Sequence, residues 1–394
     1  MKQEVKIEKL DYYANGITHV NDKITFVPST LPEEEVLIQV EKENKTFNEA
    51  SVLEYKKASN IRIENPCKYK NCGGCNLLHV CYKDELEYKQ KKIKELFKNY
   101  RVNKIIPSPK EFNYRNKITL KVIDGKLGLF ERNSHNIVNI NKCLLVNENI
   151  NNIIEELNNY NLKNVEEIVI KDNMVVIKSN KDYEIFKNLN VDNVIIINGS
   201  KEIILKGNNY IIQTIGNLQY YTSVNSFFQV NSYNTKNLYD EIIELANFKK
   251  NEIILDLYCG VGSIGLYIAS YVKKVIGIEI NYDSILDANK NMKLNKIKNV
   301  ECLCLNVNKA NVSFMFDTVI IDPPRSGLDT KTINILKHLK SNKIIYVSCN
   351  PITLKRDIKA LEESYEVLDI TPVDMFPKTY HIETITLMSR ILKK

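Results

Sequence analysis

From residue 253 to the end of the chain, short apolar runs alternate with stretches of helical period. Strands that are buried on both faces read as near-continuous apolar runs, because helices cover both sides of a parallel sheet. This alternation predicts a doubly wound α/β domain over residues 216–394, with ligands at the carboxyl ends of its strands. The runs expected as strands are 253–259, 275–280, 300–307, 318–324, 343–349, 365–371 and 382–388.

The first 215 residues have a different pattern. Residues 1–56 contain four or five short strand-like runs, which suits a small barrel of the oligonucleotide-binding type. Residues 57–215 form a central α+β domain in this prediction, with a cysteine-rich segment, a helix at 83–100 and a helix near 150–160. Its hairpins are expected at 117–130, 166–179 and 193–207.

Positive charge is concentrated in one window. Residues 56–150 contain 20 basic and 9 acidic side chains, whereas residues 1–55 contain 6 and 11. A basic segment favours RNA as a partner, because neutralised phosphates release counterions, although a solvated helix face has the same composition.

The chain has neither an apolar run long enough to span a membrane nor a secretory signal pattern at its first residues. We therefore expect a cytoplasmic monomer without a membrane partner. The nine cysteines are then expected to remain reduced rather than to form disulfides.

A glycine-rich turn follows the first strand of the α/β domain. Gly260, Gly262 and Gly265 match the GxGxxG spacing of dinucleotide sites, so a nicotinamide dehydrogenase is one interpretation. Asp256, however, places a carboxylate where a pyrophosphate would bind. S-adenosylmethionine carries a cationic sulfonium instead, and we favour this methyl donor, with Glu279 on its ribose hydroxyls. A turn that serves only helix–sheet packing is the third interpretation.

Two later strand ends carry reactive groups. Asp322–Arg325 (DPPR) is a rigid loop that suits a flipped base, and it fits amino-methyltransferases equally well. Cys349 lies at the tip of the next strand, directly before a predicted helix. This position predicts a lowered thiol pKa and an exposed thiolate.

A cysteine is useful to a methyltransferase that acts on uracil. Carbon 5 of uracil is a poor nucleophile, and thiolate addition at carbon 6 makes an enolate that attacks through carbon 5. The adduct carries an extra proton on carbon 5, which a base must remove before the thiol leaves. The segment 374–384 supplies His381 and Glu383 at the start of the last strand, and we favour Glu383 as this base.

Five ordered segments resemble the motif set of the RNA uracil-5-methyltransferase family: SFFQVN (226–231), DLYCGVG (256–262), IDPPRSG (321–327), YVSCNP (346–351) and DMFPKTYHIET (374–384). The resemblance implies a Rossmann-like, S-adenosylmethionine-dependent methyltransferase domain with Cys349 as nucleophile and Glu383 as proton acceptor. The donor contacts that it implies are Gln229, Tyr258, Glu279 and Asp322, with Ser263 and Asn306 as further candidates. Residues 1–56 similarly resemble a TRAM domain, an RNA-binding barrel, at FVP (26–28) and LPE (31–33).

Four cysteines have the spacing of metal ligands. Cys67-x4-Cys72-x2-Cys75 with a distant Cys143 is an iron–sulfur spacing, and a zinc site of four thiolates remains open. The ribosomal branch of the family is similar here, with a CGGC loop and a distant cysteine that hold a 4Fe-4S cluster. The resemblance thus implies this cluster. Because the cluster lies in the basic window, we expect it to act as a folding staple and an RNA-docking platform.

The predicted activity is methylation of uridine carbon 5 in RNA, and the cysteine pattern favours 23S ribosomal RNA over transfer RNA. An amino-methyltransferase that acts on a flipped base and a non-catalytic RNA-binding protein are the alternatives. Activity after loss of Cys349 would indicate the first, and failure to bind S-adenosylmethionine would indicate the second.

Overall fold

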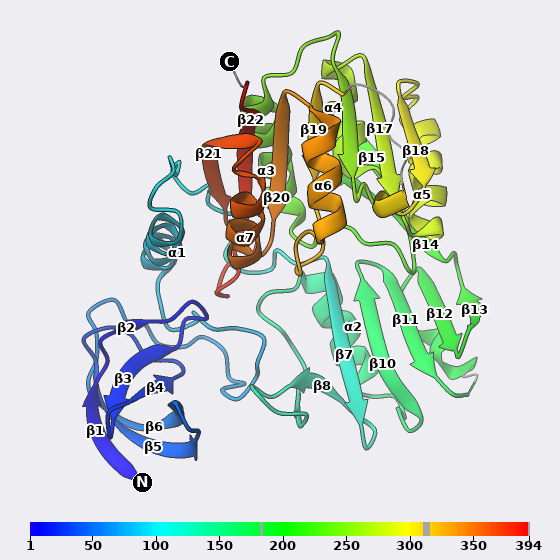
Figure 1. Cartoon of the computed structure of the whole chain (residues 1–394). Helices are drawn as coiled ribbons and strands as arrows, with labels where there is room; N and C mark the ends of the chain where they lie inside the picture. The colour runs from blue at the N-terminus through cyan, green and yellow to red at the C-terminus, as the bar shows by residue number, and fades with distance from the viewer. Residues whose placement is uncertain (182–183, 310–315, 393–394) are drawn as a thin grey trace. The chain divides into compact units, whose positions relative to one another are not determined.

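A computed structural model describes residues 1–181, 184–309 and 316–392 (Figure 1). The chain divides into two compact units. The first unit consists of Met1–Lys92, Leu129–Val138 and Phe376–His381, and the second of Ile93–Gly128, Asn139–Met375 and Ile382–Lys394. Within the described ranges, no helix is long and apolar enough to cross a membrane.

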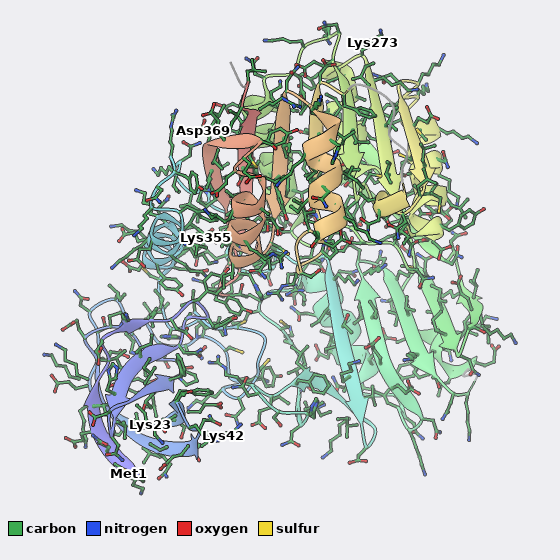
Figure 2. All side chains as sticks on the ribbon, viewed as in Figure 1. Met1, Lys23, Lys42, Lys273, Lys355 and Asp369 are labelled. Carbon is green, nitrogen blue, oxygen red and sulfur yellow. The ribbon has the colours of Figure 1, made fainter. Side chains whose placement is uncertain are left out.

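The first unit contains a six-stranded sheet in the order β1-β5-β6-β4-β3-β2. Its apolar core includes Val36 and Ile38, which alternate with outward-facing residues along β5. Lys23 of β4 and Lys42 of β5 project from this sheet (Figure 2). The strands are β1 (Lys2–Lys6), β2 (Lys9–Leu10), β3 (Gly16–Val20), β4 (Lys23–Val27), β5 (Glu35–Glu43) and β6 (Phe47–Lys57).

Helix α1 (Tyr82–Leu96) follows the cysteine-rich segment. The part of α1 that belongs to the first unit, up to Lys92, contacts the segment Phe376–His381. The Lys89 ammonium donates to Glu85 Oε1 at 2.8 Å and to the Phe376 carbonyl at 3.1 Å. The backbone N–H of Lys378 donates to the same Glu85 oxygen at 2.7 Å. A buried ion pair thus fixes the chain just before the last strand.

A second sheet has the order β13-β12-β11-β10-β7-β8-β9. The three predicted hairpins of this region are present as β7–β8, β10–β11 and β12–β13. The elements are β7 (Lys117–Ile123), β8 (Lys126–Phe130), β9 (Ile137–Asn139), α2 (Glu148–Leu157), β10 (Val165–Lys171), β11 (Met174–Ser179), η1 (Glu184–Asn188), β12 (Asn193–Asn198) and β13 (Lys201–Lys206).

A hairpin, β14 (Tyr210–Ile215) with β15 (Leu218–Ser223), leads into the predicted α/β part. The seven-stranded sheet of this part has the order β18-β17-β16-β19-β20-β22-β21, and helices alternate with its strands (Figure 1). Its elements are α3 (Ser232–Ala246), β16 (Ile253–Leu257), α4 (Ser263–Ile268), η2 (Ala269–Tyr271), β17 (Lys274–Glu279), α5 (Tyr282–Leu294), β18 (Val300–Cys304), η3 (Val307–Lys309), β19 (Thr318–Ile321), α6 (Thr330–Leu339), β20 (Lys343–Ser348), α7 (Pro351–Leu361), β21 (Tyr365–Val373) and β22 (Glu383–Arg390).

The strand order reverses between β16 and β19, which are parallel neighbours. A crevice at such a switch point is where ligands bind in open α/β sheets, outside the carboxyl ends of the strands. Lys273 directly precedes β17 and marks the opposite, amino edge (Figure 2). The last strand, β22, runs antiparallel to its neighbours β20 and β21 and separates them.

Helix α7 holds the loop that follows β19. Asp357 Oδ2 accepts hydrogen bonds from the Leu328 N–H at 2.8 Å and the Tyr346 hydroxyl at 2.7 Å. Arg356 donates to the carbonyl of Leu328 at 3.0 Å. Gly327 has φ of +73°, and a Cβ atom on it would lie 2.5 Å from Asp357 Oδ2. Only glycine fits this turn without displacing Asp357.

Gly327→Ala should therefore lower the free energy of unfolding by about 2–4 kcal/mol, since it adds a collision to a positive φ. Gly199→Ala is the matched control, because Gly199 also has a positive φ of +60° but has open space around its Cβ position. We expect the control to cost about 1 kcal/mol. Urea denaturation measures both values, and equal losses would contradict the role of the collision.

Candidate active site

Three carboxyl groups gather at the carboxyl edge of the sheet. Asp256 is 1% exposed, and Glu383 at the start of β22 is 5% exposed. Burial, followed by the charge of Asp322, raises the pKa of Asp256 to about 8. Burial alone raises the pKa of Asp322 to about 7, and burial together with Asp322 raises the pKa of Glu383 well above its usual value. Burial thus favours the protonated, neutral form of all three carboxyl groups in the free protein.

Two of these carboxyl oxygens have no hydrogen-bond partner among the described residues, namely Asp256 Oδ1 and Glu383 Oε2. The other oxygen of Asp256 accepts from the N–H of Gly265 at 3.2 Å. Buried polar atoms are normally paired, and an unpaired one calls for an explanation. A cationic or hydrogen-bonding ligand would satisfy both oxygens.

The glycine-rich turn has a left-handed backbone at three positions: Tyr258 with φ of +63°, Gly260 with +53° and Gly262 with +76°. The Gly260 N–H donates to Glu279 Oε2 at 3.2 Å, and a Cβ atom at Gly260 would meet nothing within 4 Å. This open side allows a ligand to approach the backbone closely. Ser263 Oγ, at the start of α4, accepts from the buried Tyr239 hydroxyl at 2.9 Å.

Cys349 directly follows β20, and Asn350 caps helix α7 by accepting from the Ile352 N–H at 3.2 Å. Burial, Glu383 and Asp322 raise the pKa of the Cys349 thiol to about 12, while Arg325 acts in the opposite direction. The predicted lowering of this pKa by the helix start is therefore wrong. Burial disfavours the thiolate more than the partial charge of a helix terminus favours it, and the two nearby carboxyl groups add to the effect of burial.

The other predicted donor contacts lie at the same edge or lead to it. Tyr258 Oη is 3.3 Å from Thr332 Oγ1, and Glu279 Oε1 accepts from the Asn281 N–H at 2.8 Å. Asn306, two residues after β18, accepts from the Asn308 N–H at 2.9 Å. Asn306 thus stabilises its own loop.

The segment that carries Gln229 is held by groups that sequence reasoning missed. Lys171, buried in β10, donates to the carbonyls of Ser223 and Ser226, each at 3.1 Å. Asp287 of α5 accepts from the Ser226 hydroxyl at 2.5 Å. Burial lowers the pKa of Lys171 to about 7. Nothing in a strand sequence marks a lysine as such a support.

Arg325 is a second residue whose role the sequence analysis missed. Its charge lowers the pKa values of both Cys349 and Glu383, so it acts on both predicted catalytic groups. The sequence signal that could have indicated this role is the position of Arg325 at the end of the DPPR motif. Its carbonyl accepts from Asn350 Nδ2 at 3.1 Å, which connects the DPPR loop to the turn after Cys349.

The four predicted metal ligands are distributed over both units, with Cys143 in the second and the others in the first. In the part of the chain that the structure describes, no three His, Cys, Asp or Glu side chains are arranged to hold a metal ion. Cys72 and Cys75 both raise the pKa of Arg132 against the effect of burial, so they lie near the same cation. The described geometry therefore does not by itself form a cluster site, and the cluster remains a prediction.

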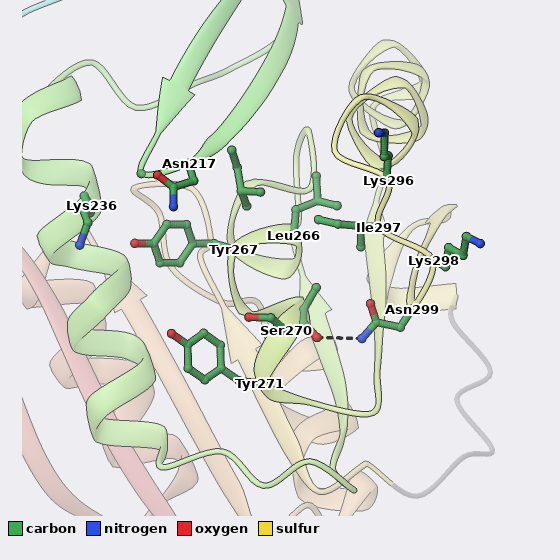
Figure 3. A pocket seen from close by; sticks show the side chains of 13 residues that line it. Asn217, Lys236, Leu266, Tyr267, Ser270, Tyr271, Lys296, Ile297, Lys298 and Asn299 are labelled. Atoms are coloured by element: carbon green, nitrogen blue, oxygen red, sulfur yellow. Dashed lines mark hydrogen bonds between the residues drawn. The ribbon is translucent and has the colours of Figure 1, made fainter.

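A separate cavity of about 760 Å³ lies in the second unit (Figure 3). Asn299 Nδ2 donates to the Ala269 carbonyl at 2.8 Å on its wall. No predicted catalytic or donor-binding residue lines it. Its polar lining residues include Asn217, Lys236, Tyr267, Tyr271, Lys298 and Asn299.

Comparisons with known proteins agree with this geometry. The family model described as tRNA (Uracil-5-)-methyltransferase matches residues 163–311 and 307–391, and the TRAM domain model matches residues 2–53. The chain is 33% identical to an uncharacterized RNA methyltransferase of Oceanobacillus iheyensis, over 96% of this chain and 94% of the relative. A similarly named Clostridium tetani protein is 31% identical, over 99% and 98%.

One solved structure is similar over its full length. It is the Pyrococcus abyssi tRNA (uracil-54, C5)-methyltransferase in complex with S-adenosyl-L-homocysteine, with a TM-score of 0.79 and 30% identity. The alignment covers 98% of this chain and 99% of the other.

Proposed function

The chain belongs to the tRNA (uracil-5-)-methyltransferase family and carries an N-terminal TRAM domain, and on this premise we propose that it methylates uridine carbon 5 in 23S ribosomal RNA through a Cys349 adduct. It is an S-adenosylmethionine-dependent RNA methyltransferase with the α/β methyltransferase fold. The observation that carries the mechanism is the position of Cys349 within electrostatic reach of Glu383, Asp322 and Arg325. We further propose that it acts as a cytoplasmic monomer.

The donor site fits a cation. Asp256 and Asp322 are carboxyl groups whose pKa values burial has raised, and a positive charge beside them would stabilise their ionised forms. When bound, S-adenosylmethionine supplies a methyl group on a cationic sulfur. The side chains proposed to hold it are Gln229, Tyr258, Ser263, Glu279, Asn306 and Asp322.

Cys349 and Glu383 divide the covalent chemistry between them. The Cys349 sulfur bonds to carbon 6, and the electrons of the 5,6 double bond form an enolate. After carbon 5 has gained the methyl group, Glu383 accepts the remaining carbon 5 proton. The double bond then reforms, the sulfur–carbon bond breaks and the thiolate returns. Glu383 must be ionised to accept this proton, and the charge of Arg325 lowers its pKa and so favours that form.

Cys349 must ionise before it can attack, although its pKa in the free protein is about 12. Arg325 lowers this pKa, and the charge of a bound donor would add to that effect. We therefore propose that Cys349 becomes reactive only in the donor-bound protein.

The affinity for S-adenosylmethionine should rise by about tenfold between pH 6 and pH 8. Asp256 and Asp322 have pKa values of about 8 and about 7, so both hold protons at the lower pH. A cation binds better to their ionised forms, and binding below this range must release protons. Titration calorimetry across this pH range measures the effect, and Asp322→Asn should flatten the profile. An affinity that is constant or falls with pH would contradict this account.

The target RNA is tested by mass spectrometry of nucleosides from cells with and without the gene. Loss of 5-methyluridine from 23S ribosomal RNA is the expected result. Loss from transfer RNA would instead support the second candidate, which the likeness to the Pyrococcus abyssi enzyme favours. Loss of a base methylated on an amino group would favour the amino-methyltransferase alternative.

We propose that Cys67, Cys72, Cys75 and Cys143 hold a 4Fe-4S cluster in a central domain at 57–215, between the TRAM part at 1–56 and the catalytic part at 216–394. Protein purified without oxygen should contain iron and sulfide at about four atoms each per chain. Cys72→Ser should lose both, whereas Cys304→Ser, which changes an exposed cysteine outside the set, should retain them. Zinc without sulfide would indicate a four-thiolate zinc site, and absence of any metal would contradict the proposal.

A further inference from the structure

An aromatic cluster lies in the first compact unit, whereas the residues proposed for methyl transfer belong to the second. Tyr12 and Tyr13 come from the turn between β2 and β3, and Tyr380 and His381 come from the segment Phe376–His381. The ring centroids of Tyr13 and Tyr380 are 5.2 Å apart, and those of Tyr380 and His381 are 4.0 Å apart. Tyr13 is 50% exposed. The cluster therefore presents an aromatic ring to solvent on an aromatic support.

The turn that carries Tyr13 has a fixed conformation. Asp11 Oδ1 accepts from the N–H groups of Tyr13 at 2.8 Å and Asn15 at 2.7 Å. The Asp11 N–H donates to the Asn15 carbonyl at 2.8 Å, and Ala14 has a left-handed backbone with φ of +62°. A turn closed by its own aspartate presents Tyr13 without the entropy cost of ordering a mobile loop.

Helix α1 contacts the cluster through Lys92 and Tyr88. The Lys92 ammonium lies 3.9 Å from the centroid of the Tyr12 ring and donates to the Tyr380 carbonyl at 2.7 Å. The Tyr88 hydroxyl donates to the Asp11 carbonyl at 2.8 Å. Lys92 is only 8% exposed. Burying an ammonium costs free energy, and apolar side chains would join helix α1 to the aromatic rings at a lower cost in free energy.

The charge of this region argues against binding through phosphates alone. Residues 1–55 carry 6 basic and 11 acidic side chains, so a polyanion gains little from them. Stacking on an aromatic ring does not depend on such charge, because every base has a π-face. An exposed tyrosine on a rigid support is thus the feature of residues 1–55 best suited to RNA.

We propose that Tyr13, supported by Tyr12 and Tyr380, is a stacking platform for an unpaired base of the substrate RNA. The inference rests on the proposed function and extends it to recognition of a further nucleotide of the same RNA. Only Ile382 separates His381 from Glu383 in the sequence, so the segment that supports the platform continues directly into the strand with the proposed base.

The test uses the full chain with S-adenosylhomocysteine and a fluorescent oligouridylate of about 12 nucleotides, followed by anisotropy. Tyr13→Ala and Tyr13→Leu should weaken binding about five- to thirty-fold, because stacking is lost even when an apolar side chain remains. Tyr13→Phe should bind within about twofold of the wild type. Tyr271→Ala is the matched control, since Tyr271 is 44% exposed and lies in the second unit.

The ratio of the Kd values of Tyr13→Ala and wild type should be the same at about 50 mM and about 200 mM salt, because stacking releases no counterions. Wild-type affinity in Tyr13→Ala, or full binding in Tyr13→Leu, would overturn the platform. A ratio that falls steeply with salt would also overturn it. Donor affinity and the identity of the methylated nucleoside are measured separately. A product other than 5-methyluridine would contradict the proposed function. The RNA affinities of the Tyr13 variants would still test the stacking platform independently.

Discussion

Cys349→Ser abolishes uridine methylation, with an expected loss in rate of about 10⁴-fold or more, which is the scale for removal of a catalytic nucleophile. Serine has nearly the same size, but its hydroxyl ionises far less readily than a thiol in a site that already raises the thiol pKa to about 12. Donor affinity should be unchanged, which separates lost chemistry from lost binding. Cys304→Ser provides the control, because Cys304 is an exposed cysteine outside the proposed set.

RNA that contains 5-fluorouridine gives this prediction a direct readout. Fluorine cannot leave as a proton does, so the wild type should accumulate a methylated covalent complex that survives denaturing electrophoresis. Cys349→Ser should form none. Full methylation by Cys349→Ala would instead identify an amino-methyltransferase, in which the sulfur plays no part.

Glu383→Gln produces the opposite phenotype with ordinary RNA, namely accumulation of the methylated adduct. Turnover should fall by about 10²- to 10⁴-fold, because an amide does not remove the carbon 5 proton. Adduct formation should not slow, since the carboxylate that raises the pKa of Cys349 is gone. Quench-flow sampling with mass spectrometry of the protein distinguishes the two steps.

Glu241→Gln is the matched control for Glu383→Gln. Burial also raises the pKa of Glu241, but its Oε1 accepts from the Thr371 hydroxyl at 2.7 Å, outside the proposed site. It should leave turnover within about twofold of the wild type. Normal turnover in Glu383→Gln, or a loss of turnover without an adduct, would assign the base to another residue.

Much of the α/β sheet was predictable, because its strands are apolar on both faces and their ends are marked by turns. Each of the seven predicted runs overlaps an observed strand, from β16 to β22. The insertion of β22 between β20 and β21 was not predictable from composition. The first unit was predicted less completely: four or five short strands were expected in residues 1–56, where the structure has six, β1 to β6. Ile7, between β1 and β2, donates its N–H to the Glu34 carbonyl at 2.8 Å, a contact set by the fold.

The candidate site could be outlined from sequence because strand ends of a parallel sheet meet at one edge. Its electrostatics could not, since Asp322 and Glu383 act on Cys349 from strands that are distant in the sequence. The support of Gln229 by Lys171 was equally hidden, because it depends on a neighbouring sheet and not on local pattern.

The central place of β22 also bears on how the protein is made. Translation proceeds from the amino end, so β22 leaves the ribosome after every other strand of its sheet. Until then the strand that lies between β20 and β21 is missing, and Glu383 has not joined Cys349. The chain therefore gains its proposed chemistry only when its last strand joins the sheet, in the same event that completes the sheet.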